Sequence, residues 1–382
     1  MAEFDSFRPP EPPRGPKRRG GAGNRADVAK GAGAGNAAGG STRYGGKKQR
    51  RGEELMVPRA DFEQYDSYYG RPIVKFPPWE WPIGVYFFLG GVAGGSSLLA
   101  VGAGATGNRE LERNTRLAAA VAAAVGSGCL VLDLGRPERL LNMFRVFKLS
   151  SPMSVGSWIL GSFSAGAMVA AATEADTLTG ERIPLPAPIR QAVHALATPA
   201  GVAAGIMGAP LAVYTAVLLG NTSVPMWQGA HKTLPNLFVS SAACASSGVA
   251  LVTTSTANNG PARVLAGAGA VADVVASKSV ERSLDEPLPE TMHQGKAGRM
   301  LKTAEALVVA GGIGAVLGGK NRIVAGLSGV ALAAASCLTR FGIIAAGKRS
   351  TEDPKYVVEP QRNRLRARQE AGEVGDSITT AR

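Results

Sequence analysis

The sequence predicts an all-α integral membrane protein, a bundle of eight transmembrane helices preceded by a disordered basic N-terminal tail. Two observations lead to this fold class. From about residue 79 to 347, apolar segments rich in Ala, Gly, Val and Leu follow one another, separated by short charged stretches. About 20 apolar residues in a helix cross a bilayer core of roughly 30 Å, and these segments have that length. The first 75 residues, by contrast, contain almost nothing apolar.

The N-terminal tail, residues 1–75, is crowded with Gly, Pro, Lys and Arg. Buried apolar surface cannot offset the entropy of ordering such a segment, so we expect disorder. The net charge of +13 over 382 residues invites a nucleic-acid interpretation. However, the basic residues have no interleaved aromatic residues and form no recognisable module. We therefore expect contact with the headgroups of membrane lipid and no nucleic-acid partner.

Eight spans can be drawn, each bounded by charges or by proline. They cover about residues 79–102, 117–134, 152–173, 190–219, 234–256, 262–277, 299–318 and 322–346. Pro199 and Pro210 predict a kink or a late start in the fourth span. The sixth span is the weakest because it is short and contains Asp273. If it did not cross, the two termini would lie on opposite sides. The bundle takes up residues 76–347, and residues 348–382 form a C-terminal tail.

The distribution of Lys and Arg predicts the orientation, because cationic residues near helix ends stay in the cytoplasm. With eight spans, one side carries both tails and the loops near residues 135–150, 221–233 and 278–298. That side holds about 17 Lys and Arg close to the membrane, against about 8 on the other. We therefore expect a multi-pass protein of the inner (plasma) membrane with both termini and the C-terminal tail in the cytoplasm.

The sharpest local motif is DLGRPER, residues 133–139, between the second and third spans. Its Gly and Pro end the helix, and four charges alternate in sign along seven residues: Asp133, Arg136, Glu138 and Arg139. Such charges can pair with one another where the dielectric is partly reduced. The motif predicts a rigid turn at the membrane interface.

These residues, continued to LLNMFRVFKLSSPMSVGSWIL, resemble the hallmark loop of the NrfD/PsrC family, the membrane subunits of polysulfide reductase and its relatives. The first span, WEWPIGVYFFLGGVAGGSSLL, is similar to the family's aromatic and glycine-rich opening helix. YTAVLLGNTSVPMW, residues 214–227, resembles its YTGVLL segment, and STEDPKYVVEPQRNR resembles its closing segment. The resemblance covers about residues 76–365.

The resemblance implies a subunit that passes electrons between a membrane quinone, menaquinone above all, and a bound iron-sulfur protein. That partner is expected to be a ferredoxin-like subunit, connected to a molybdenum or tungsten enzyme or to a larger respiratory complex. The quinone is expected near the start of the first helix, on the docking side. This places Trp79, Glu80 and Tyr86 in the quinone site, together with Arg136, Glu138 and Arg139 of the loop. A tyrosine there can donate a hydrogen bond but cannot supply a proton at neutral pH.

The sequence predicts no haem and no iron-sulfur cluster within the chain itself. Haem b in a membrane subunit requires pairs of His facing one another inside spans. Of the three His, only His194 lies in or near a span, whereas His231 and His293 fall in predicted loops. Clusters require grouped thiolates, but the three Cys lie in three different spans. We expect these Cys to be packing residues and expect no metal site.

Ionisable residues within spans are candidates for proton transfer, because a charge in hydrocarbon is costly. Asp133, Asp273 and Glu305 lie near the predicted cytoplasmic ends, where they could supply protons to a quinone, and so does Arg340. Structural alternatives exist for each. Glu305 can pair with Lys302 one turn away, the arginine can extend to the interface, and Asp273 can sit at a helix end. His194, near the opposite face, is expected to be structural.

Two other functions remain open from the sequence. A secondary transporter would also be polytopic, glycine-rich and poor in charge, but such proteins carry internal repeats and broken helices. Pro199 and Pro210 are the only hint of a broken helix, and no repeat is evident. A structural anchor would hold the iron-sulfur protein without binding quinone. The terminal substrate belongs to another subunit and cannot be read from this chain.

Overall fold

The computed structural model describes residues 72–135, 137–184 and 186–372. In these residues all regular structure is helical, which confirms the predicted all-α class. The expected disordered tail lies outside the described residues except for residues 72–75, which precede the first helix. Arg136 of the DLGRPER motif and residues 373–382 of the C-terminal tail also lie outside them.

Eight long helices correspond one to one to the eight predicted spans. They are α1 (Trp81–Ala105), α2 (Arg109–Asp133), α3 (Pro152–Leu178), α4 (Ala187–Gly220), α6 (Leu234–Thr253), α7 (Gly260–Ser283), α9 (Gly295–Gly318) and α10 (Arg322–Glu352). Helix α4 starts before both prolines and continues through them, so the late start expected for this span is not found. Helix α10 runs past the predicted boundary at residue 347.

Four short elements connect or follow these helices. They are the 3-10 helix η1 (Pro137–Phe144), α5 (Pro225–Gly229), α8 (Glu290–His293) and α11 (Lys355–Glu370). The first of them contains the last three residues of the DLGRPER motif and the five residues that follow it, so the second half of the expected interfacial turn is a short helix. The last lies where a C-terminal tail was expected.

Seven of the eight long helices are apolar enough to cross a membrane by length and composition, and α7 is the exception. Its contacts nevertheless show that it runs the full length of its neighbours. Asn259, just before α7, donates a hydrogen bond to the carbonyl oxygen of Gly319 at the end of α9 (3.2 Å). At the other end, the hydroxyl of Ser283 lies 2.8 Å from that of Thr233, next to the start of α6. An eight-helix antiparallel bundle is therefore consistent with the structure.

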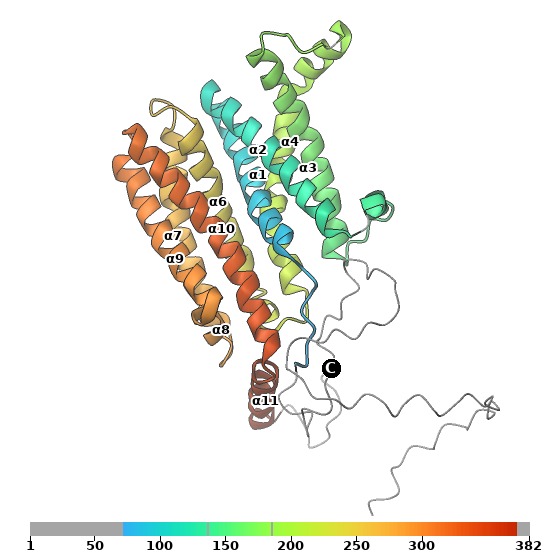
Figure 1. Ribbon diagram of the computed structural model, residues 1–382, viewed down its shortest axis with the longest axis vertical. Helices are drawn as coiled ribbons and strands as arrows, with labels where there is room; N and C mark the ends of the chain where they lie inside the picture. The colour runs from blue at the N-terminus through green and yellow to red at the C-terminus, as the bar shows by residue number, and fades with distance from the viewer. Residues whose placement is uncertain (1–71, 136, 185, 373–382) are drawn as a thin grey trace, which may run out of the picture. The chain divides into compact units, whose positions relative to one another are not determined.

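The helices form two four-helix groups that meet along α1, α4, α6 and α10 (Figure 1). The first group contains α1 to α4, and the second contains α6, α7, α9 and α10. Glycines allow the closest approaches within and between them. A Cβ added to Gly208 of α4 would lie 2.7 Å from the carbonyl oxygen of Gly94 in α1, so only glycine fits there. In lipid, such small residues let helices pack by direct backbone contact.

An aromatic cluster holds the start of α1 against α5 and α10. Trp79 stacks on Trp227 of α5 with ring centroids 5.5 Å apart and planes 19° apart, and Phe76 lies 5.5 Å from the same ring. Trp227 is fully buried, and its Nε1 donates a hydrogen bond to the carbonyl oxygen of Ile343 in α10 (2.8 Å). This cluster joins the two helix groups at the end where α1 begins.

We expect Trp227→Ala to destabilise the fold by about 3–5 kcal/mol, because it removes a fully buried indole and leaves a cavity. Thermal unfolding of the purified protein in detergent measures this change. Trp81→Ala is the matched control, since Trp81 is 60% exposed and its loss should change stability little. Equal midpoints for the two variants would contradict the packing role of Trp227.

Candidate functional site

A cavity of about 440 Å³ lies among α1 to α4 and η1, at the end where α1 begins. Its wall is mostly apolar, with a few polar side chains set into it. The polar lining residues are Tyr86, Ser127, Asp133, Ser157, Ser164 and Tyr214. A largely apolar cavity with a small number of placed polar groups is the usual form of a small-molecule site.

Two tyrosines from different helices meet inside this cavity. The hydroxyl of Tyr86 in α1 is hydrogen-bonded to that of Tyr214 in α4. Tyr86 is buried, and burial of a phenol is favourable only when its hydroxyl has a partner. Each hydroxyl has one proton, so one of the two donates to the other and the second proton is free for a ligand. The pair therefore offers one hydrogen-bond donor to a molecule in the cavity.

A second polar group in the wall has no hydrogen-bond partner among the described residues. The buried hydroxyl of Ser164 in α3 makes no hydrogen bond to any described residue. Ser157, about two turns earlier, instead donates to the carbonyl oxygen of Met153 (3.0 Å), as helical serines commonly do. A buried hydroxyl without a partner costs free energy unless a ligand or water satisfies it. Ser164 is thus a second point for binding a polar ligand atom.

Aromatic side chains build the remaining walls. Trp79 and Phe87 pack edge to face, with centroids 6.0 Å apart, and both line the cavity. Phe144 of η1 also lines it and packs edge to face on Trp158 of α3 at 5.7 Å. This contact holds η1 against α3 as one side of the cavity. Met153, which is half exposed, forms part of the rim.

Asp133 supplies the only acidic side chain in the cavity lining. It is the last residue of α2 and is partly buried. Its carboxyl faces the backbone N–H of Glu80, just before α1, so the ends of these two helices meet at this point. The carboxyl is therefore in contact with both the cavity and the surface of the domain.

Of the rest of the DLGRPER motif, Leu134 also lines the cavity, and the other described residues lie at the surface. Glu138 is exposed, Arg136 is not among the described residues, and nothing is described of the side chain of Arg139. The apolar residues that follow the motif contact the cavity instead: Leu140, Met143 and Phe144. The apolar residues after the motif thus form a wall of the cavity, and Glu138 adds a negative charge at the surface.

Three residues that the sequence predicted for a site, Trp79, Tyr86 and Asp133, come together in this cavity. Glu80 and Glu138 are exposed beside it, and Asp273 and Glu305 do not line it. The sequence analysis missed Tyr214 and Ser164. Tyr214 stands in the YTAVLL segment, where a phenol within an apolar span was an available signal. Ser164 had none, since many serines occur in the spans.

A second polar cluster lies in the other helix group, around Arg340 of α10. Arg340 is fully buried, and its Nη2 donates to the carbonyl oxygen of Phe238 (2.7 Å). Its guanidinium carbon lies 3.6 Å from the centre of the Phe238 ring, a cation–π contact. The remaining nitrogens, Nε and Nη1, have no partner among the described residues. One structural alternative was that Arg340 extends to the membrane interface. The structure contradicts it, because the side chain is fully buried.

Asp273 balances this buried charge. It is 5% exposed on α7, accepts a hydrogen bond from Ser240 (3.4 Å), and attracts Arg340 electrostatically. Asp273 lies near the middle of α7, inside the helix bundle. The alternative that it sits at a helix end is therefore wrong. Two buried charges of opposite sign compensate each other where neither alone is tolerated.

Glu305 and His194, the other ionisable residues considered from the sequence, each contact a side chain of opposite or complementary charge. Glu305 lies 3.5 Å from Lys278 of α7, so its described partner is this lysine and not the expected Lys302. His194 contacts the buried carboxylate of Asp176 at 3.0 Å, near the end of the domain opposite the cavity. This contact agrees with the expected structural role.

Comparison with known protein families gives a match to the central part of the chain. Residues 73–260 match the family model described as "Polysulphide reductase, NrfD". This stretch includes α1 to α6 and every residue that lines the cavity, whereas α9 and α10 lie beyond it. No curated protein matches the chain.

We expect Asp273→Leu to destabilise the protein by about 3–5 kcal/mol, because it leaves Arg340 buried without a counter-charge. The double variant Asp273→Leu/Arg340→Met should recover most of this loss. Thermal unfolding in detergent measures both, with Glu305→Gln as a control at a partly exposed ion pair. If the double variant were as unstable as the sum of the two single variants, the two charges would not compensate each other.

Proposed function

Because this chain belongs to the NrfD family of polysulphide reductase membrane proteins, as residues 73–260 show, we propose that it binds a quinone in the cavity of α1 to α4 and exchanges electrons with an iron-sulfur subunit. One observation carries the proposal. The cavity offers a donor from the Tyr86–Tyr214 pair and an unpartnered hydroxyl on Ser164, in a wall that is otherwise apolar and aromatic.

These residues fit the chemistry of a quinone. Its ring and isoprenoid tail are apolar, and its two carbonyl oxygens accept hydrogen bonds. The tyrosine pair and Ser164 can donate to such oxygens, and Trp79 and Phe87 provide flat apolar surface for the ring. When bound, the quinone supplies two-electron, two-proton redox chemistry. Our proposed ligand is menaquinone or another membrane quinone.

The residues of the chain hold the ligand and handle its protons. A phenol has an ordinary pKa near 10, so at neutral pH Tyr86 orients the ligand and is not a source of protons. Asp133 is the group that can take up or release a proton, because a carboxyl at the rim can exchange with water. It therefore connects the cavity with the membrane surface. We keep Asp273 and Glu305 out of this step, since neither lines the cavity.

The proposed partner is a ferredoxin-like subunit that docks where α1 begins. The cavity opens near that end, so a cluster bound there would be close to the quinone. The exposed carboxylates of Glu80 and Glu138 lie at the same end and would contact the partner. The excess of Lys and Arg in these loops supports a cytoplasmic location for this side. A molybdenum or tungsten enzyme would be reached through the partner.

We expect Tyr86→Phe to weaken menaquinone binding about 5- to 10-fold, because it removes the partner that holds the Tyr214 hydroxyl in place for donation to the ligand. Tyr86→Phe/Tyr214→Phe should bind more weakly still, since it removes the last phenol donor from the cavity. Titration of the purified complex with a menaquinone analogue, followed by tryptophan fluorescence, measures the dissociation constant. Tyr356→Phe is the control: Tyr356 is also buried but lies in α11, away from the cavity. Unchanged affinity in the Tyr86 variants would remove the pair from the site.

Ser164→Ala should weaken menaquinone binding severalfold without lowering the thermal stability of the ligand-free protein. The reason is that the Ser164 hydroxyl makes no hydrogen bond within the described chain, so its removal loses nothing when the cavity holds no quinone. The same fluorescence titration measures the affinity, and an unfolding curve without quinone measures the stability. A destabilised protein with normal affinity would show that Ser164 is only structural.

Purification of the complex from its native membrane, with assays for bound quinone and for iron, tests the function as a whole. We expect both to be present in amounts comparable with this subunit. Glu138→Arg should lower the recovered iron and leave the quinone, since Glu138 is exposed beside the cavity and outside its lining. A structural anchor would retain iron alone, and a transporter would retain neither.

A further inference from the structure

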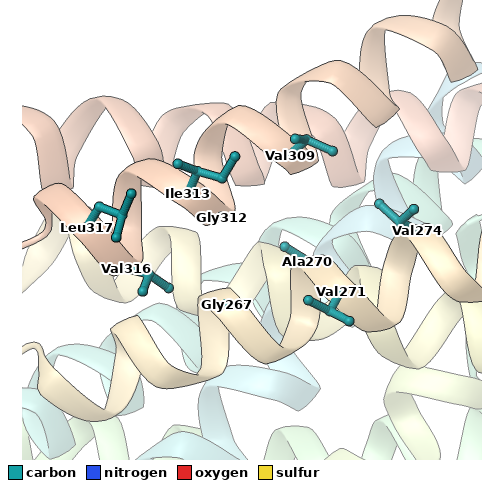
Figure 2. Close-up of a pocket in the computed structure, with 9 residues that line it drawn as sticks. All are labelled: Gly267, Ala270, Val271, Val274, Val309, Gly312, Ile313, Val316 and Leu317. Carbon is teal, nitrogen blue, oxygen red and sulfur yellow. The ribbon is translucent and has the colours of Figure 1, made fainter.

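An apolar groove of about 480 Å³ runs between α7 and α9, in the helix group that does not contain the cavity (Figure 2). Nine residues line it, and all are aliphatic or glycine: Gly267, Ala270, Val271, Val274, Val309, Gly312, Ile313, Val316 and Leu317. Val271 and Leu317 are 68% and 81% exposed. The groove lies mostly beyond the residues that match the NrfD family, and the proposed quinone chemistry does not use it.

Cationic side chains stand at one end of the groove. Arg263 is one helical turn before Gly267 on α7. Lys320 lies four residues after Val316, in the turn that follows α9. Arg263 is fixed there, because its Nε donates to the carbonyl oxygen of Ala315 (3.0 Å) and its Nη2 to that of Val316 (2.7 Å). Neither cation forms an ion pair with a described carboxylate, so both positive charges remain available.

The opposite end is electrically balanced. Lys278 and Glu305 continue the same two helix faces, and their side chains lie 3.5 Å apart across the groove. The groove is thus apolar along its length, positive at one end and closed by an ion pair at the other. From Arg263 to Lys278 the helix rises about 22 Å, and the apolar lining covers about half of that. Half of a hydrocarbon core is about 15 Å, the depth of one leaflet.

We propose that this groove binds an anionic phospholipid, with the phosphate at Arg263 and Lys320 and one acyl chain along the aliphatic lining. The charge at the end fits a phosphate headgroup, and the aliphatic lining, about 11 Å long, covers most of the length of an acyl chain within one leaflet. Phosphate pairs favourably with arginine and lysine near a membrane surface. The bound lipid would fill the space between α7 and α9. It would thereby cover part of α7, the one long helix that does not meet the criteria for a membrane span.

Two other occupants fit the groove less well. A quinone would find no polar side-chain atom in the lining for its carbonyl oxygens. A second transmembrane helix would need exposed small residues, but the groove's glycines serve the contact between α7 and α9. A Cβ on Gly312 would lie 2.5 Å from that of Ala270, and one on Gly267 would lie 2.7 Å from the Val316 side chain.

Native mass spectrometry of the full-length protein, delipidated and then mixed with defined lipids, tests the proposal. The probes are phosphatidylglycerol and phosphatidylcholine with identical acyl chains. We expect one phosphatidylglycerol to be retained more tightly than phosphatidylcholine, and the preference to fall about fivefold for each cation removed in Arg263→Gln and Lys320→Gln. Val271→Trp should weaken both lipids, because the indole blocks the path of the chain.

Arg182→Gln is the matched control, an exposed cation near the same end of the domain but away from the groove, and it should leave the preference unchanged. Lys320→Gln keeps the test decisive if Arg263→Gln does not fold, since Lys320 holds no described contact of the protein. Equal retention of the two lipids, or an unchanged preference in Lys320→Gln, would overturn the proposal. So would crosslinking that shows the groove covered by a second copy of this chain.

Discussion

The absence of water inside a bilayer is the constraint on which this structure depends. Every backbone N–H and C=O in the hydrocarbon must be satisfied internally, so the chain folds into long helices with short connections. The same constraint makes polar side chains costly inside the bundle, and most described ones are hydrogen-bonded. The exceptions therefore mark where another molecule or a balancing charge is required. Ser164 is such an exception in the cavity wall, and Arg340 is one in the other helix group.

Helix α1 connects these two places. It is the most buried of the helices able to span the membrane, and it packs against helices of both groups. Tyr86 points to the cavity on one side, and Gly91 leaves room for the Arg340 guanidinium on the other. Between them a chain of aromatic contacts runs from Phe87 to Phe238, with ring centroids 6.4 Å apart. Two aromatic rings, those of Phe87 and Phe238, therefore separate the cavity from the buried Arg340.

The sequence predicted the helices well because their signal is local. A run of apolar residues between charges defines a span without knowledge of the fold, and seven of the eight predicted spans meet the criteria for crossing. The eighth, around Asp273, was weak for a reason that only tertiary contacts resolve. Its carboxyl faces Ser240 and Arg340 inside the bundle, so the charge that lowered the apolar signal is compensated by another helix.

The site was predictable only in part, because it depends on contacts between distant helices. Trp79 and Tyr86 belong to the opening-helix motif, and Asp133 is the first residue of the DLGRPER motif. The resemblance of these two motifs to the family drew attention to all three residues. The partner of Tyr86 is Tyr214, 128 residues away, and no spacing rule connects the two. Ser164 is one serine among many, and what distinguishes it is the lack of a partner, which only coordinates can show.

Photolabelling with an azido-menaquinone, followed by mass spectrometric mapping of the labelled peptides, tests the central claim most directly. The account predicts labels on α1, α3 and α4, at residues that line the cavity around Tyr86, Ser164 and Tyr214, and competition by unmodified menaquinone. Labels confined to the α7–α9 groove, or spread over the lipid-facing surface without competition, would contradict a quinone site in this cavity.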